Sequence, residues 1–173
     1  CAYPYDEFSA VSDSLGFKDF TENAMRRMRE RLRAVDYVAW RFGYTPWERH
    51  LAECQTRLAH GMAVFDYEMN QNFAIDYEKM KWEEIRAKMA PYRDPANYRF
   101  LREMPCDDVS ALVLRDLDIF LNRYGFSSVM RSPAVLVGSM EPDSVAKEDA
   151  VMMAVDTAIL GADEPSLLGR LMV

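Results

Sequence analysis

The stretch TPWERHLAECQTRLAHGMAVFDYEMNQNFAIDYEKMKWEEIRAKMA, residues 45–90, has the pattern of one long amphipathic helix. Its start is marked by Thr45, Pro46 and Glu48, which supply a capping hydroxyl, a proline at the first helical position and a reciprocal carboxylate. Apolar or small side chains then recur every three or four residues and form one stripe: Trp47, Leu51, Cys54, Leu58, Met62, Phe65, Met69, Phe73, Tyr77 and Met80. Pro91 cannot continue the helical hydrogen bonds. The sequence therefore predicts a continuous helix over residues 46–90, with Gly61 as its weakest point.

A helix is also predicted immediately before this stretch, over residues 21–42. Its apolar side chains recur with alternating spacings of three and four residues: Met25, Met28, Leu32, Val35, Ala39 and Phe42. Gly43 is the residue type most often found directly after a helix. Because only Gly43 and Tyr44 separate this helix from the Thr45 cap, we expect the two helices to form a long antiparallel hairpin.

The remainder of the chain predicts an all-α fold with two or three shorter helices. These are expected at residues 95–104, from residue 107 or 108 to residue 124, and at residues 142–160; residues 132–138 fit either a helical turn or an isolated strand. The resulting layout is an extended N-terminal arm at residues 1–20, a single α-helical domain at residues 21–161 and an apolar C-terminal tail at residues 162–173.

Composition excludes several classes of protein. A formal charge of −7 over 173 residues argues against general affinity for nucleic acid. No run of 18 or more uncharged apolar residues is present, so no transmembrane span is expected, although peripheral association with a membrane complex stays compatible with the sequence. The three cysteines form no CxxC pair, which indicates neither a disulfide framework nor a zinc knuckle.

The first residue, Cys1, leads to two hypotheses about localisation. One is an imported organellar protein, mitochondrial or plastid, whose targeting peptide has been removed. The other is a bacterial envelope lipoprotein acylated at Cys1. The aromatic residues Tyr3 and Tyr5 stand where a lipoprotein would have a flexible polar tether, so the organellar hypothesis is favoured.

The only grouping of potential metal ligands by sequence is His50, Glu53, Cys54 and His60. His50 and Cys54 are four residues apart and share a helix face, as two ligands on a helix would. His60 points elsewhere, and neither HExxH nor ExxH spacing occurs. The favoured interpretation is that Cys54 belongs to the apolar stripe and that both histidines are partly exposed. No metal, cofactor or catalytic residue is predicted.

Two charged sets are interpreted as solvated helix surface. The first comprises the carboxylates Asp66, Glu68, Asp76, Glu78, Glu83 and Glu84, which alternate with lysines. The second comprises Arg26, Arg27, Arg29, Arg31 and Arg33, which are expected to face solvent, to pair with acidic neighbours such as Glu22 and Glu30, or to meet an acidic partner.

The leading hypothesis is a non-catalytic structural or accessory subunit of a larger multi-protein assembly, with other protein subunits as partners. A helix of this length exceeds what a compact domain of this size can cover, so part of its apolar stripe would bind a partner. The residues expected to bind partners come from the two arms and the long helix: Tyr3, Tyr5, Phe8, Phe65, Met69, Phe73, Leu167, Leu168, Leu171 and Met172. The alternatives are a helical protein or enzyme with a small-molecule pocket lined by Met and aromatic side chains, and the envelope lipoprotein.

Overall fold

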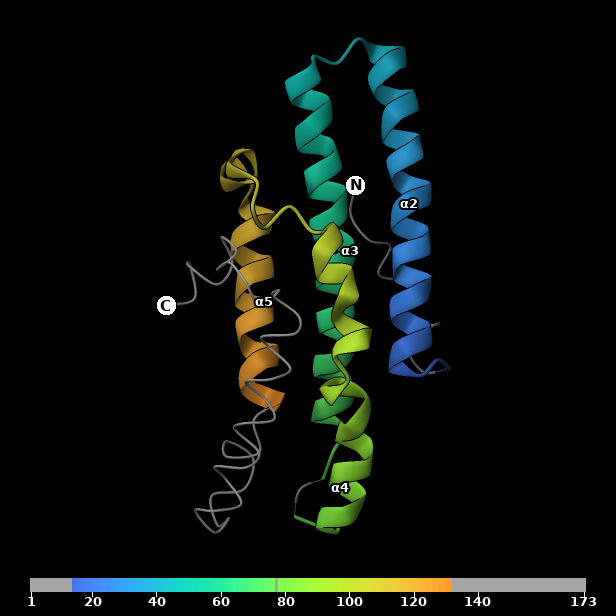
Figure 1. Cartoon of the computed structure of the whole chain (residues 1–173), viewed down its shortest axis with the longest axis vertical. Helices are drawn as coiled ribbons and strands as arrows, with labels where there is room; N and C mark the ends of the chain where they lie inside the picture. Colours follow the sequence, from blue (N-terminus) through green and yellow to red (C-terminus); the bar gives the residue numbers. More distant parts are fainter. Residues whose placement is uncertain (1–13, 77, 132–173) are drawn as a thin grey trace.

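The computed structural model describes residues 14–76 and 78–131, and these residues form the all-α fold predicted from the sequence (Figure 1). The elements in order are α2 (Phe17–Phe42), α3 (Pro46–Phe73), α4 (Trp82–Met89), three short 3-10 helices η1 (Ala90–Arg93), η2 (Pro95–Glu103) and η3 (Val109–Val113), and α5 (Arg115–Arg131). The described ranges contain no strand, and none of their helices is both long and apolar enough to cross a membrane. The elements expected at residues 132–138 and 142–160, and the C-terminal tail, lie outside the described residues.

The predicted antiparallel hairpin is confirmed. α2 and α3 pack side by side and are joined at one end of the molecule (Figure 1). Gly43 adopts the left-handed conformation, with φ of 69°, and its N–H donates to the carbonyl of Ala39. At the start of α3, the hydroxyl of Thr45 accepts from the N–H of Glu48 while the Glu48 carboxylate accepts from the N–H of Thr45. Local signals in the sequence therefore define the turn.

The N-terminal arm is shorter than predicted, because α2 begins at Phe17 and residues 17–20 belong to the helix. Phe17, Phe20 and Ala24 are spaced by three and four residues and are all buried, so they extend the helical stripe of α2 toward the N-terminus. Gly16 has extended backbone angles and ends the helix on that side.

The prediction of one continuous helix over residues 46–90 is wrong, because α3 ends at Phe73 and α4 begins at Trp82. The helix passes through Gly61 without interruption. After Phe73 the side chain of Asp76 accepts hydrogen bonds from the backbone N–H groups of Glu78 and Lys79. Aspartate and asparagine side chains compete in this way for backbone groups that a helix would use. The break also turns Ile75 into the core, where it is buried.

A third layer, formed by η1, η2 and α5, packs on the hairpin. α5 lies against α3 on the side away from α2 (Figure 1), whereas η2 contacts both α2 and α3. After α4 the chain returns along the hairpin through η1 and η2, and α5 then runs in the same direction as α3. The helix expected from residue 107 or 108 to residue 124 is instead divided into η3 and α5, and α5 continues past Gly125 to Arg131.

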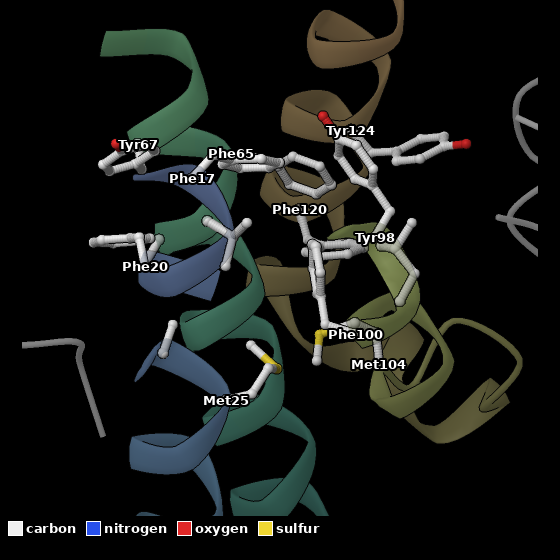
Figure 2. Close-up of a cluster of buried hydrophobic side chains, with 14 of the residues drawn as sticks. Phe17, Phe20, Met25, Phe65, Tyr67, Tyr98, Phe100, Met104, Phe120 and Tyr124 are labelled. Carbon is white, nitrogen blue, oxygen red and sulfur yellow. The ribbon is translucent and has the colours of Figure 1, made fainter. Parts of the chain in front are cut away.

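The core lies where α2, α3, η2 and α5 meet, and it is rich in aromatic rings (Figure 2). Phe65 of α3 lies at its centre, with its ring centroid 5.7 Å from that of Phe100, 5.5 Å from Phe120 and 5.9 Å from Tyr124. On the α2 side, the rings of Phe20 and Tyr67 stack at 4.4 Å. Tilted and edge-on contacts of this kind add to the stability that burial itself provides.

Candidate functional site

The end of the hairpin carries a concentration of exposed aromatic side chains, which we call the aromatic end: Tyr37, Trp40, Phe42, Tyr44 and Trp47. Trp40 is 77% exposed and Phe42 is 72% exposed. The rings of Tyr37 and Trp40 lie 6.0 Å apart, and the guanidinium of Arg41 lies 6.0 Å from the centroid of the Phe42 ring. Phe42 and Trp47 were predicted to belong to the packed stripes of their helices. They lie at the helix ends, beyond the part of the hairpin that the third layer covers (Figure 1).

A cleft of about 550 Å³ lies between α2 and α3 beside this aromatic end. Its lining combines two of the aromatic residues with charged groups: Asp36, Ala39, Trp40, Tyr44, Pro46, Arg49, His50 and Glu53. Arg49 joins the two helices, with its guanidinium 2.6 Å from the Asp36 carboxylate and 2.9 Å from that of Glu53. A second cleft of about 620 Å³, between α2 and η2, is lined mostly by polar and charged side chains.

His50 also belongs to a cluster with Cys54 and Asp108, which we call the His–Cys–Asp cluster. His50 and Cys54 lie one turn apart on α3, as their spacing predicted. The Nε2 atom of His50 is 2.5 Å from Oδ2 of Asp108 and 3.7 Å from Sγ of Cys54. The distance from Cys54 Sγ to Asp108 Oδ2 is 3.6 Å. Three donor atoms of different chemistry, any of which can bind a metal ion, therefore face one another.

Backbone structure fixes the position of each member of this cluster. Asp108 is the residue before η3, and its Oδ1 accepts a hydrogen bond of 2.9 Å from the N–H of Ser110, which leaves Oδ2 directed at His50 and Cys54. Burial tends to raise the pKa of the Asp108 carboxyl, but the hydrogen bonds from Ser110 and from His50 outweigh it and lower that pKa overall. Asp108 is therefore a carboxylate at neutral pH.

The same cluster is poorly arranged for nucleophilic catalysis. In a Cys–His–Asp relay the thiol and the carboxylate contact opposite nitrogens of the imidazole, so that the ring can transfer a proton. Here Cys54 and Asp108 both approach Nε2 of His50. The Cys54 thiol is only 2% exposed, and burial, together with the charge of Asp108, raises its pKa to about 11. A thiol in that state is a weak nucleophile at neutral pH.

The structure places the predicted partner-binding residues in different environments. Phe65 is 1% exposed and packs entirely within the core, which corrects the hypothesis that its side chain binds a partner. Met69 is half-buried and lies 3.9 Å from the guanidinium of Arg123. Phe73, at the end of α3, is 68% exposed. The other predicted partner-binding residues lie outside the described residues: Tyr3, Tyr5, Phe8, Leu167, Leu168, Leu171 and Met172.

Three further polar residues differ from their predicted positions. Glu68 was predicted to lie on a solvated surface, but it is 1% exposed and accepts a hydrogen bond of 2.6 Å from the Ser127 hydroxyl of α5. Asp66 is only partly exposed and lies 2.9 Å from the guanidinium of Arg123. His60 is buried rather than partly exposed, and its Nδ1 donates to the carbonyl of Thr56. α5 covers the side of α3 that carries Asp66 and Glu68, whereas His60 lies near Arg27 and Arg31 of α2. The pattern within one helix does not reveal either contact.

The sequence indicated His50 and Cys54 as potential metal ligands that share a helix face, although no metal site was predicted, and it did not indicate Asp108. The aspartate is 58 residues from His50, and the signal that relates it to a structural role is only the Asp-x-Ser pattern typical of a helix cap. Of the five residues of the aromatic end, only Phe42 and Trp47 were assigned to packed helix stripes from the sequence, and the five were not predicted to form an exposed group. Comparison of the chain with protein-family models, with curated proteins and with solved structures finds no match.

Proposed function

We propose that this protein is a non-catalytic structural subunit that binds another protein through the aromatic end of its helical hairpin. The observation that carries the proposal is the exposure of all five aromatic side chains between residues 37 and 47. Large aromatic residues bury on the order of 150–250 Å² each when they pack, so exposing five of them at one end of a molecule forgoes considerable stabilisation. Such concentrations on a soluble protein are typical of interaction sites.

The residue types at this end indicate a protein partner. Trp, Tyr and Arg are the residues that most often dominate the binding energy of protein interfaces. Arg41 lies beside the ring of Phe42, and Arg33 is exposed four residues before Tyr37, so the surface that fits this end would combine apolar side chains with carboxylates. A lipid surface fits less well, because residues 31–53 carry four arginines against three carboxylates, whereas segments that bind anionic lipid carry an excess of several basic residues.

The proposal is tested by affinity purification of the chain from its native source, with quantitative mass spectrometry of the proteins that co-purify. Three forms are compared: the unchanged chain, the double variant Trp40→Ser/Phe42→Ser, and Phe73→Ser as the matched control at the opposite end of α3. All three changes replace exposed aromatic side chains, so the fold should be unaffected, which circular dichroism checks. We expect a partner at fixed stoichiometry that the double variant loses and the control retains.

Three results would overturn the proposal. In the first, the chain purifies alone and as a monomer. In the second, Trp40→Ser/Phe42→Ser retains the partner and Phe73→Ser loses it, which would place the interface at the other end of α3. In the third, the purified chain would float with vesicles containing anionic lipid, and the double variant would not. That outcome would identify the aromatic end as a membrane-surface anchor.

A further inference from the structure

We propose that His50, Cys54 and Asp108 form a zinc-binding site that joins α3 to the start of η3. None of the three donors is one of the aromatic residues of the proposed interface, although His50 lines the same cleft as Trp40 and Tyr44, and the proposal does not depend on that interface. Its three donors are an imidazole nitrogen, a thiol sulfur and a carboxylate oxygen, all of which are common ligands of zinc in proteins.

The distances between the donor atoms match zinc coordination in two of three cases. Around a tetrahedral zinc ion, with Zn–S of about 2.3 Å and Zn–N and Zn–O of about 2.0–2.2 Å, a sulfur ligand lies roughly 3.6 Å from the other donors. Sγ of Cys54 is 3.7 Å from Nε2 of His50 and 3.6 Å from Oδ2 of Asp108. The nitrogen and oxygen themselves, at 2.5 Å, are hydrogen-bonded.

Binding would require only the nitrogen and the oxygen to separate. Their distance in a tetrahedral site is about 3.4 Å, so the 2.5 Å contact would open by roughly 0.9 Å. Both side chains are half-buried and reach the cluster from the surface, so small rotations can provide this change without disturbing the core. Cys54, which is buried, already lies at the required distance from both.

The helix and the hydrogen bonds around the cluster hold its donor atoms in place, as they do in metal sites of proteins. His50 and Cys54 are one turn apart on a continuous helix, which holds two ligands rigidly. The N–H of Ser110 holds the other oxygen of Asp108, and hydrogen bonds of this kind orient metal ligands. His50 also lines the cleft between α2 and α3, from which an ion and its remaining water ligand can enter.

The donor set also decides the class of ion. Magnesium and calcium prefer oxygen ligands alone, so a site with sulfur and imidazole nitrogen favours zinc or a similar transition metal. When zinc binds, the thiol of Cys54 gives up its proton to the buffer. Nε2 of His50 also loses the proton that it donates to Asp108, either to the buffer or by exchange through solvent to Nδ1, so that Nε2 and Oδ2 of Asp108 can both bind the ion. With three protein ligands, water would complete the coordination.

Cobalt(II) is the most direct probe, because a thiolate bound to it gives a charge-transfer absorption band in the near ultraviolet. The full chain is used with Cys1→Ser and Cys106→Ser, so that Cys54 is its only thiol. We expect one cobalt ion per chain to produce the band and zinc to abolish it by displacement. His50→Ala and Asp108→Ala should each weaken zinc binding by more than about 100-fold, since altering groups behind the ligands costs 10–100-fold.

Asp107→Asn is the matched control, because it removes the neighbouring carboxylate and leaves the three donors in place. Its zinc affinity should equal that of the parent protein. The proposal is overturned if the Cys1→Ser/Cys106→Ser parent, shown to be folded by circular dichroism, gives no band in excess cobalt. That result requires neither His50→Ala nor Asp108→Ala to fold. It is also overturned if the band and the affinity persist in both His50→Ala and Asp108→Ala.

Discussion

Gly61 allows two layers of the protein to approach α3 closely. A Cβ atom at this position would lie 2.6 Å from Sδ of Met104 and 2.7 Å from Cε2 of Phe120. Met104 follows η2, and Phe120 lies on α5, so one missing side chain makes room for both. The sequence indicated Gly61 as a weak point of the helix. In the structure α3 is continuous there, and the glycine is instead a packing position.

Gly61→Ala should therefore destabilise the protein, although alanine is the better helix former. The gain in helix propensity is about 1 kcal/mol, while overpacking a core typically costs about 1–3 kcal/mol, and the rigid Phe120 ring makes the upper part of that range appropriate. We expect a net loss of about 1–2 kcal/mol in the free energy of unfolding, measured by urea denaturation. Gln55→Ala, at an exposed position of the same helix, is the control and should change stability little. An increase in stability for Gly61→Ala would contradict the close packing.

His60 provides a prediction about pH. Burial is the largest influence and lowers the pKa of His60 below the ordinary 6.5. The hydrogen bond to Thr56 opposes it, and the nearby charges of Arg31 and Arg27 lower the pKa by smaller amounts. Below about pH 6.5 the unfolded chain binds a proton at His60 that the folded chain does not, so stability falls as the pH decreases toward the pKa in the folded state. Above about pH 6.5 the group contributes no pH dependence.

The variant His60→Asn tests this linkage, because its amide can still donate to the Thr56 carbonyl and carries no charge. Between about pH 6.5 and 5, the free energy of unfolding should fall more steeply for the parent protein, by up to about 1.4 kcal/mol per pH unit. Urea denaturation at a series of pH values measures both slopes. Parallel slopes would show that His60 becomes protonated equally in both states.

At the scale of elements, the sequence predicted the turn of the hairpin better than the other helix boundaries. The Thr45 cap and Gly43 act through neighbouring residues, so their consequences can be read locally. The end of α3 could not be read from its apolar stripe, because that stripe continues beyond Phe73. The useful signal was polar: Asn70 and Asn72 are weak helix formers, and the side chain of Asp76 accepts hydrogen bonds in the turn that follows.

The candidate sites could also be predicted only as far as local sequence signals reach. The helical spacing of His50 and Cys54 predicts that they share a face, but only the tertiary fold brings Asp108 to them. In the same way, Phe65 and Trp47 belong to one periodic stripe, yet the third layer covers Phe65 and leaves Trp47 exposed. Periodicity shows which residues share a face. It does not show how much of that face another element covers.

The whole molecule divides into a three-layered part and a two-helix part (Figure 1). Around the core, α3 is covered by α2 on one side and by η2 and α5 on others. Toward the turn of the hairpin, every residue from Arg41 to Arg49 is exposed. In the C-terminal part of α2, from residue 32 onward, only Val35 and Ala39 are buried. The aromatic end lies in the two-helix part, and the His–Cys–Asp cluster lies where α3 meets the start of η3. The proposed protein interface is therefore separate from the part that stabilises the fold.

This division predicts two levels of local stability within the single helix α3. Segments with few buried contacts open more readily, and their amide hydrogens exchange faster. By hydrogen exchange and mass spectrometry, peptides from residues 37–49 should exchange at least about tenfold faster than peptides from residues 58–68. A protein partner should slow exchange around Trp40 and Phe42 and so reduce the difference in exchange rate between the two groups of peptides. Zinc should instead slow exchange around Cys54 and Asp108. Equal protection along all of α3 would mean that the hairpin opens only as one unit with the core, and the two-part description would fail.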